Sequence, residues 1–250
     1  MKSVRILNID ILSITERQLL EQFESGVLFT PNVDHLMNLQ KDPEFYAAYR
    51  QADYVVCDSQ IIHFISYLLR DPIAETIAGS DFLSSFYYYH KNNPNMKMFF
   101  LGAAEGVART AMKIINKKVG RDIVVGAHSP SFGFEKNEDE CSNIVNIINS
   151  SDANVLIVGV GSPKQEKWIV KYKDQLPGIK IFMGLGATID FEANAIPRSP
   201  RIFRRLGLEW LHRLCMNPKK LWRRYLINDL PFFVLIFRQK LKHYKDPFAG

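Results

Sequence analysis

Cysteine is scarce in this chain, and its scarcity excludes two kinds of protein. The 250 residues include only Cys57, Cys141 and Cys215, an odd number spread widely over the sequence. Such usage argues against a disulfide framework and against a zinc site built from thiolates, and it fits a reducing compartment. The first residues include Asp10 and no long apolar run, so we expect no signal peptide and a cytoplasmic protein.

Long apolar runs are absent as well. The best, residues 230–237, has eight residues and contains Pro231, whereas a helix that spans a bilayer needs about 20 apolar residues. The sequence therefore predicts no transmembrane helix. Apolar residues nevertheless make up 47% of the chain, which is ordinary for a globular protein and enough for a substantial core.

Three motifs of nucleotide-dependent enzymes are missing. Neither the GxGxxG of dinucleotide-binding folds nor the GxxxxGK[ST] of phosphate loops occurs, which counts against a dehydrogenase and a kinase. The metal-binding Asp-x-Asp of many sugar transferases is also absent, and its nearest match is Asp190-Phe191-Glu192. We therefore expect chemistry without a metal ion or other cofactor, in which N–H groups and cations stabilise the charge of a leaving group.

Positive charge is concentrated at one end of the chain. Residues 197–250 contain thirteen Lys or Arg and three acidic residues, a local charge of +10. Of the 32 basic and 26 acidic residues in the whole chain, the first 196 residues hold 19 and 23, a net charge of −4. This split predicts a nearly neutral core, 1–196, and a basic appendage, 197–250, that meets an anionic partner. The alternative is an ordinary solvated surface.

Short apolar runs alternate with helical patterns along the core. Six runs of β-branched or aromatic residues predict buried strands, at 27–30, 54–57, 97–101, 123–125, 155–158 and 180–183. Segments of helical period lie between them, such as 107–119 and 138–149. This alternation predicts an α/β fold with a Rossmann-like, mostly parallel sheet flanked by helices. Residues 4–15 predict a small antiparallel ribbon beside the sheet.

The appendage has a different pattern. The stretches 206–214, 219–227 and 229–244 combine Leu, Trp, Tyr or Phe with Arg and Lys in the manner of basic amphipathic helices. Such helices suit the surface of an anionic membrane, where rings such as those of Trp210 and Trp222 enter the headgroup region and cations meet lipid phosphate. The alternative is that these aromatic residues pack against the core.

Two glycine-rich turns follow predicted strands and precede helices. They are Gly102-Ala103-Ala104-Glu105-Gly106 and Gly159-Val160-Gly161-Ser162-Pro163-Lys164-Gln165-Glu166. Small residues let the backbone approach a ligand, and the start of a helix offers N–H groups and a positive dipole end to phosphate. Pro163 suits a first helical turn, and Lys164 adds positive charge for a diphosphate. Tight turns need glycine in any case, so purely structural turns are the alternative.

Asp58 is the candidate general base. It follows the second predicted strand, where a partly desolvated carboxylate binds a proton more tightly. A hydroxyl group attacks well only when a base removes its proton. Thr30, after the first strand, is placed to hydrogen-bond to that base or to a ligand. The alternative role of Asp58 is to cap the helix that follows, and His35 and His63 are expected to be packing or surface residues.

Together these features resemble the WecG/TagA/CpsF family of bacterial glycosyltransferases. The resemblance covers about residues 9–225, and the Gly-x-Gly-x-Pro-Lys-Gln-Glu and Gly-Leu-Glu-Trp runs are its most specific parts. In chain order the shared motifs are Thr30-Pro31-Asn32, Gly79-Ser80-Asp81, Phe100-Leu101-Gly102, the turn from Gly159 to Glu166, Gly184-Leu185-Gly186-Ala187-Thr188-Ile189-Asp190-Phe191, Arg198-Ser199-Pro200 and Gly207-Leu208-Glu209-Trp210.

The resemblance implies an inverting transfer of a sugar from a UDP-sugar to a polyprenyl-diphosphate-linked saccharide. The sugar would be an N-acetylhexosamine or a hexose, and the product a bacterial cell-surface polysaccharide. The implied location is the inner face of the cell membrane, where the protein binds peripherally to anionic lipid. Nucleic acid is not an expected partner, and a homo-oligomer is left open.

The resemblance also implies roles for individual residues. The base and the threonine proposed for the family match Asp58 and Thr30. Donor binding is expected of Asn32, Gly79, Asp81, Gly102, Gly106, Gly159, Gly161, Pro163, Lys164, Gln165, Glu166 and Asp190. Arginines of the appendage complete the site and touch the membrane in the family, and the matching region here holds Arg198, Arg201, Arg205, Arg213 and Arg223 together with Trp210 and Trp222.

The chain departs from the family pattern at two places. Cys57-Asp58-Ser59 stands where the family has Pro-Asp-Gly, and Glu75-Thr76 stands where it commonly has Glu-Arg. If that arginine binds donor phosphate in relatives, another cation replaces it here or the donor preference differs. The departures motivate an alternative, a non-catalytic, membrane-docked protein that binds a nucleotide sugar. A nucleic-acid-binding tail is a third possibility, which the amphipathic placement of Trp210, Trp222 and Phe232 disfavours.

Overall fold

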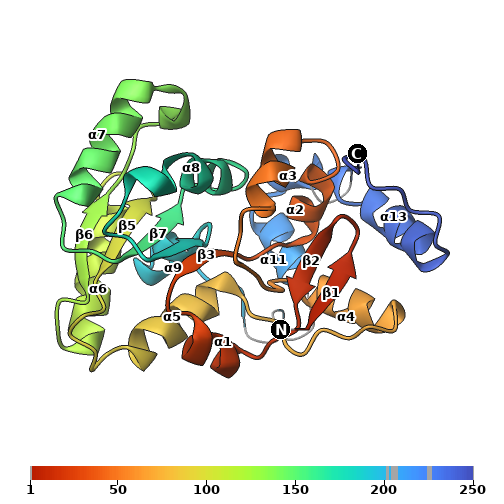
Figure 1. Ribbon diagram of the computed structural model, residues 1–250, viewed down its shortest axis with the longest axis horizontal. Helices are drawn as coiled ribbons and strands as arrows, with labels where there is room; N and C mark the ends of the chain where they lie inside the picture. Colours follow the sequence, from red (N-terminus) through yellow and green to blue (C-terminus); the bar gives the residue numbers. More distant parts are fainter. Residues whose placement is uncertain (1, 201–202, 204–207, 224–226, 250) are drawn as a thin grey trace.

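A parallel sheet forms the centre of the molecule. In the computed structural model, which describes residues 2–200, 203, 208–223 and 227–249, six strands pair in the order β4-β3-β8-β7-β5-β6, and each neighbouring pair is parallel (Figure 1). The strands are β3 (Gly26–Phe29), β4 (Tyr54–Val55), β5 (Met98–Gly102), β6 (Val124–His128), β7 (Val155–Gly159) and β8 (Ile181–Gly184). The predicted α/β fold is confirmed, and each strand overlaps a run that the sequence indicated.

A two-stranded antiparallel ribbon precedes the sheet, as predicted. It consists of β1 (Ser3–Ile6) and β2 (Ile9–Leu12), with Val4 opposite Ile11. Buried and exposed residues alternate along both strands, because one face of the ribbon packs against the core and the other meets solvent. A single bridge between Leu12 and Val56 joins the ribbon to the edge of the sheet beyond β4.

Helices cover both faces of the sheet, and the side chains of each strand alternate between two hydrophobic cores. In β3, Val27 and Phe29 belong to one core, whereas Leu28 belongs to the other. The first core receives residues from α2 (Val33–Asn38), α3 (Pro43–Tyr49), α4 (Gln60–Leu68), α7 (Glu138–Asn149) and α8 (Lys164–Tyr172). The second receives them from α1 (Glu16–Gln22), α5 (Gly79–Tyr89), α6 (Val107–Val119) and α9 (Thr188–Glu192). Two short 3-10 turns, η1 (Phe134–Lys136) and η2 (Lys173–Gln175), complete this part of the chain.

Polar residues at helix starts fix where several helices begin. Thr15 and Gln18 form a reciprocal capping box at α1, and Asn137 accepts a hydrogen bond from the N–H of Glu140 at α7. Asn32 caps α2 by accepting from the N–H of His35. The side chain of Asn32, predicted to bind the donor, is therefore engaged in a helix cap in this structure.

The described part of the appendage contains α11 (Glu209–Met216), α12 (Pro218–Arg223) and α13 (Pro231–Lys240). One face of α13 packs against the core, where Phe232 is 0% and Ile236 is 1% exposed. Gln239 strengthens this contact, because its Oε1 accepts from the N–H of Leu7 and its Nε2 donates to the carbonyl of Arg5, both over 2.8 Å. The alternative interpretation of the aromatic residues, packing against the core, thus holds for one face of α13.

The opposite face of α13 is exposed and apolar. Phe233, Val234 and Phe237 are all more than half exposed, and they follow helical spacing. Within the described ranges, no helix has both the length and the apolar content needed to cross a membrane.

Candidate active site

The carboxyl ends of the parallel strands lie along one edge of the sheet, and the predicted site residues follow them. From β5 the chain passes to β6 on one side, and from β7 it passes to β8 on the other side. The order of the strands along the sheet therefore reverses between β5 and β7. Ligands of open α/β sheets bind outside the carboxyl ends of the strands at such a point. The topology therefore places the two glycine-rich turns on either side of a potential ligand crevice.

The two turns approach each other closely. Gly102 has a φ of +138°, and a Cβ atom built on it would lie 2.4 Å from the carbonyl oxygen of Gly159. The N–H of Ala103 donates to that same carbonyl over 3.2 Å. Only glycine fits at position 102, because a side chain would collide with the backbone of the neighbouring strand. Gly102 thus serves the close approach of two strand ends, as in the purely structural alternative, and donor binding by Gly102 stays a prediction.

The carboxylate of Asp58 is bound to the start of another helix. Asp58 follows β4 and is half-buried, and its Oδ1 accepts a hydrogen bond from the N–H of Gly79 over 2.9 Å. Gly79 is the first residue of α5, whose N-terminus carries a positive partial charge. The hydrogen bond thus holds the Oδ1 atom of Asp58 at the start of α5. The N-cap of α4 is Ser59, whereas Asp58 accepts from the first N–H of α5. The alternative role of Asp58, bonding to the start of a helix that follows it, is therefore met at α5 rather than at α4.

Thr30 lies beside Asp58. A Cβ atom built on Gly79 would lie 3.2 Å from Thr30 Oγ1 and 3.1 Å from Leu185 Cδ2, so three chain segments meet around this glycine. The N–H of Asp58 also donates to the carbonyl of Pro31 over 3.3 Å. The structure thus brings the predicted base and the predicted threonine together, although they are far apart in the sequence.

Cys57 directly precedes Asp58. Its side chain is 1% exposed, and burial raises the pKa of the thiol to about 12. The thiol is therefore neutral at physiological pH, and it does not compete with Asp58 as a base or as a nucleophile.

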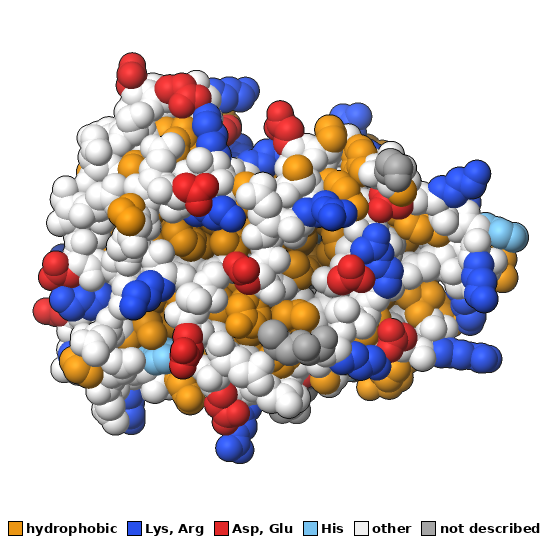
Figure 2. All heavy atoms as spheres, in the orientation of Figure 1, with side chains coloured by type: hydrophobic (Ala, Val, Ile, Leu, Met, Phe, Trp, Pro, Cys, Tyr) orange, Lys and Arg blue, Asp and Glu red, His pale blue; other side chains and the backbone are white. Residues whose placement is uncertain are grey.

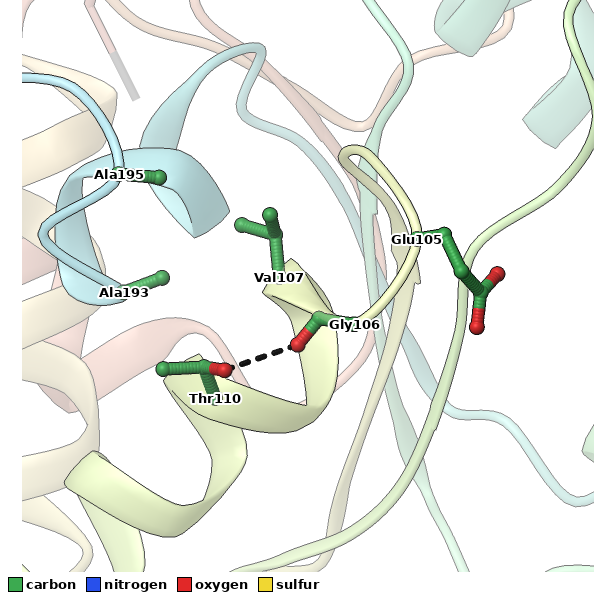
Figure 3. A pocket seen from close by; sticks show the side chains of 6 residues that line it. All are labelled: Glu105, Gly106, Val107, Thr110, Ala193 and Ala195. Atoms are coloured by element: carbon green, nitrogen blue, oxygen red, sulfur yellow. Dashed lines mark hydrogen bonds between the residues drawn. The ribbon is translucent and has the colours of Figure 1, made fainter.

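An open hollow of about 390 Å³ lies at the start of α6. Three segments line the hollow, as Figure 3 shows: the end of the glycine-rich turn, the first turns of α6 and the chain after α9. Their lining residues are Glu105, Gly106, Val107, Thr110, Ala193 and Ala195. The side chain of Glu105 points away from Ala193 and Ala195 in this view. Thr110 Oγ1 donates to the carbonyl of Gly106 over 2.9 Å, which stabilises the first turn of α6. The hollow is walled mainly by small side chains next to a glycine where donor binding is predicted.

The polar side chains of the turn after β7 contact other groups of the protein. Lys164 Nζ lies 3.2 Å from Glu135 Oε1 and 4.9 Å from the centre of the Phe132 ring. Pro163 is the N-cap residue of α8. Gln165 is buried and accepts a hydrogen bond on Oε1 from the N–H of Gly186 over 3.0 Å. In this structure, Lys164 and Gln165 are therefore engaged by protein groups, and donor binding by either stays a prediction.

Glu166, His35 and Tyr49 form a buried polar cluster directly behind this turn, and no sequence pattern predicted it. Glu166 is 0% exposed, and its Oε1 lies 4.0 Å from His35 Nδ1. His35 Nδ1 in turn lies 2.7 Å from the hydroxyl oxygen of Tyr49. Burial raises the pKa of Glu166 to about 7, although a hydrogen bond from Gln165 opposes the shift. Burial, with the nearby charges of Glu166 and Asp58, raises the pKa of Tyr49 well above its usual value.

Asp190 follows β8 at the start of α9 and is half-buried. Burial raises the pKa of its carboxyl group above the usual value. Among the described residues, no three or more His, Cys, Asp or Glu side chains are grouped so that they could hold a metal ion.

Arg198 is the appendage arginine that reaches the site within the described residues. Its Nη2 donates to Ser80 Oγ over 2.7 Å and to Asp81 Oδ1 over 2.8 Å. The guanidinium group also lies 5.7 Å from the centre of the Phe191 ring. Ser80 and Asp81 follow Gly79, so Arg198 contacts the same helix start that holds Asp58.

The other predicted appendage residues are less fully defined. Arg201 and Arg205 lie outside the described residues, as does the side chain of Arg213. Trp210 is partly buried, whereas Trp222 is 49% exposed and Arg223 is exposed. Their roles toward an acceptor or a membrane stay predictions.

Comparison with known proteins gives one family. The sequence profile of the family described as "Glycosyl transferase WecG/TagA/CpsF family" matches residues 4–246. Similar curated proteins are the N-acetylglucosaminyldiphosphoundecaprenol N-acetyl-beta-D-mannosaminyltransferases of Staphylococcus aureus strains MRSA252, MW2 and NCTC 8325. Each is 28% identical to this chain over 242 residues, which cover 92% of the chain and 90% of the relative.

Proposed function

Because the chain belongs to the WecG/TagA/CpsF family of glycosyltransferases, we propose that it transfers a sugar from a UDP-sugar to a polyprenyl-diphosphate-linked saccharide. The sugar is an N-acetylhexosamine or a hexose, and the product belongs to a bacterial surface polysaccharide. The observation that carries the proposal is the position of Asp58, half-buried beside Thr30 and held by the N–H of Gly79 at the ligand-binding edge of the sheet. The relatives' names, which specify a lipid-linked acceptor, support the acceptor class.

The reaction requires one base and a stabilised leaving group. Asp58 removes the proton of an acceptor hydroxyl as its oxygen attacks the anomeric carbon of the donor sugar. The new bond joins that carbon to the acceptor oxygen, while the bond to the UDP oxygen breaks and its electron pair leaves with UDP. Attack from the face opposite UDP inverts the anomeric centre. Asp58 then gives its proton to solvent.

The donor diphosphate belongs near the two glycine-rich turns. The starts of α6 and α8 present N–H groups and positive dipole ends there. Gly102 lets the turns approach closely, and the hollow beside Gly106 offers space for part of the donor. Arg198 contacts the first turn of α5 through Asp81, and its guanidinium group lies on the side of the site that holds Asp58. We propose that these groups stabilise the departing UDP without a metal ion.

The acceptor lipid requires the protein to work at a membrane surface. The exposed apolar face of α13 comprises Leu230, Phe233, Val234, Phe237 and Leu241, which recur at helical spacing. Exposed Arg238, Lys240, Lys242 and Lys245 accompany it, and Figure 2 shows Lys and Arg side chains over the end of the molecule formed by α13. We propose that this face docks on anionic lipid at the inner side of the cell membrane.

The experiment that tests this function is UDP release by the full-length protein. A panel of UDP-sugars is incubated with a short-chain polyprenyl-diphosphate saccharide, with and without EDTA. Release that requires the acceptor and survives EDTA is the expected result, and it identifies the donor. Release that EDTA abolishes would overturn the metal-free proposal. Binding of UDP-sugars without any turnover over a broad panel would favour a non-catalytic nucleotide-sugar-binding protein.

A further inference from the structure

The hydroxyl group of Ser129 contacts the first glycine-rich turn, residues 102–106, from the neighbouring strand. Ser129 directly follows β6, which pairs with β5. Its Oγ donates to the carbonyl oxygen of Ala104 over 2.9 Å and lies 3.2 Å from the carbonyl oxygen of Gly102. A hydroxyl group has one proton, so the two carbonyls share it. No pattern in the sequence predicts this contact, because β5 and β6 meet only in the folded sheet.

These contacts fix the direction of two peptide groups in the turn. Both peptide bonds are trans, and in a planar trans peptide the C=O and the N–H point in opposite directions. The carbonyl of Gly102 faces Ser129, so the N–H of Ala103 faces the other way. That N–H donates to the carbonyl of Gly159 over 3.2 Å. The N–H of Glu105 is directed away from Ser129 in the same manner, and among the described residues it makes no hydrogen bond.

The turn needs such support because its backbone is strained. Ala103 has a φ of +58°, in the left-handed region that a residue with a side chain adopts only at a cost. Gly102 and Gly106 also have positive φ values, +138° and +80°. A backbone of this kind persists only where its surroundings hold it in place. The Ser129 hydroxyl group and the carbonyl of Gly159 hold this turn from two sides.

The segment that carries Ser129 is itself anchored. Ser131 donates from its N–H to Glu140 Oε1 over 2.7 Å and from its Oγ to Glu140 Oε2 over 2.6 Å, at the start of α7. Phe134, further along, is 2% exposed, and its ring lies 6.4 Å from the Trp168 ring of α8. Contacts with α7 and α8 therefore fix where the Ser129 hydroxyl group lies.

The same segment also contacts the second glycine-rich turn. Glu135 Oε1 lies 3.2 Å from Lys164 Nζ, and Lys164 belongs to the turn that follows β7. Residues 129–135 therefore contact both of the turns near which the donor diphosphate is proposed to bind. Ser129 makes the contact with the turn that leads into α6.

We propose that Ser129 is a positioning residue for the donor, whose hydroxyl group holds the turn 102–106 in the shape in which N–H groups at the start of α6 meet the donor diphosphate. The inference rests on the proposed function. Without the hydroxyl group, the carbonyls of Gly102 and Ala104 lose their common partner, and the N–H groups of the turn lose their fixed direction. The donor then binds more weakly. Proton removal by Asp58 does not involve Ser129, so the rate of the bound complex is unchanged.

Binding of UDP to the full-length protein, measured by isothermal titration calorimetry, tests the proposal. Ser129→Ala is expected to raise the Kd of UDP about 3- to 10-fold, as the loss of one hydrogen bond predicts. The KM of the donor should rise by the same factor, while kcat stays within about twofold of wild type, a split that a general loss of structure would not produce. Ser129→Thr keeps the hydroxyl group and is expected to restore the wild-type Kd.

Ser150→Ala is the matched control. Ser150 Oγ also donates to a carbonyl, that of Asn146 over 2.8 Å, but at the end of α7. This position precedes β7 and so lies at the amino-terminal edge of the sheet, opposite the two turns. The control variant is expected to bind UDP with the wild-type Kd.

A Kd of UDP for Ser129→Ala equal to that of the wild type would overturn the proposal. Ser129→Val covers the case in which Ser129→Ala does not fold, because valine has nearly the shape of threonine without the hydroxyl group. Equal Kd values for Ser129→Thr and Ser129→Val would likewise overturn it. Failure of the proposed function has a different result, in which Ser129→Ala weakens UDP binding but the wild-type protein releases no UDP with any acceptor. A wild-type protein that does not bind UDP would overturn both.

Discussion

Arg198 Nη2 lies 2.8 Å from Asp81 Oδ1, so a residue that follows the core contacts the first turn of α5. The N–H of Gly79, in the same turn, donates to Asp58. One short segment of α5 thus connects the candidate base to the first arginine of the predicted appendage. The predicted boundary between residues 196 and 197 falls just before Arg198, so its contact with Asp81 joins the two predicted parts.

Replacing Arg198 should affect activity more than stability. The side chains of Arg198 and Asp81 are 31% and 45% exposed, and a partly exposed ion pair stabilises a fold by at most about 1 kcal/mol. Misplacement of the helix start that holds Asp58 costs far more in rate, and we expect Arg198→Ala to lower kcat about 10- to 100-fold. Urea unfolding and steady-state kinetics measure the two effects. Arg17→Ala, which removes an exposed pair with Glu21, serves as the control, and a wild-type kcat for Arg198→Ala would refute this role.

Adding a methyl group at Gly79 should disturb the arrangement of Thr30 and Asp58 around this residue. The new Cβ would lie 3.2 Å from Thr30 Oγ1 and 3.1 Å from Leu185 Cδ2, which is tight enough to displace both. We expect Gly79→Ala to cost about 1–3 kcal/mol of unfolding free energy and to reduce kcat at least tenfold. At Gly178 a Cβ would meet only the carbonyl oxygen of Ala153, at 3.8 Å. Gly178→Ala is therefore the matched control, and equal kcat values for the two variants would contradict the prediction.

Two adjacent phenylalanines on α13 separate core packing from membrane docking. Phe232 is 0% exposed, whereas Phe233 is 51% exposed on the outward apolar face. Phe232→Ala should cost about 3–5 kcal/mol of unfolding free energy, because it leaves a cavity in the core. Phe233→Ala should leave stability within about 0.5 kcal/mol of wild type and weaken co-flotation with vesicles that contain anionic lipid. Unchanged flotation of Phe233→Ala would remove the support for docking through this face.

The buried carboxyl group of Glu166 should make stability depend on pH. Its folded pKa, about 7, is raised above the unfolded value near 4.5, so between these values the folded protein binds more protons. Stability therefore falls as the pH rises from about 4.5 to 7 and levels off above that, by about 3 kcal/mol in total for this group. Urea unfolding at pH 5 and pH 8 should show this loss in the wild-type protein and a smaller loss in Glu166→Gln. Equal losses in both proteins would mean that Glu166 ionises freely in the folded state.

The sequence predicted the fold well because its strands are short, apolar and separated by clear helical patterns. The bounds of α6 and α7 agree with the predicted ranges 107–119 and 138–149. The positions of Gly102 and Asp58 at the carboxyl ends of strands were also predicted, because both stand at the end of an apolar run in the sequence; their roles toward a ligand stay predictions. Local patterns of this kind depend on residues close together in the chain.

Contacts between distant segments were not predictable in the same way. His35, on a helical stretch, was expected to be a packing or surface residue, and nothing near it in the sequence marks Glu166 or Tyr49 as its neighbours. Lys164 sits at a helix start and was expected to meet a diphosphate, but Glu135 lies within 3.2 Å of it. The pattern of residues 229–244 likewise did not reveal which aromatic face of α13 packs against the core. Each of these outcomes depends on how elements pack, which periodicity and spacing do not encode.

The central claim is that Asp58 removes the proton of the acceptor hydroxyl, and Asp58→Asn tests it most directly. The amide oxygen of the substituted side chain can still accept the hydrogen bond from Gly79, so the local structure is kept while the base is lost. Asp152→Asn, at a side chain that is 80% exposed and paired with Lys97, is the control. In acceptor-dependent UDP release, the account predicts that kcat of Asp58→Asn falls about 10²- to 10⁴-fold while donor binding is unchanged. Turnover of Asp58→Asn at the wild-type rate would contradict it.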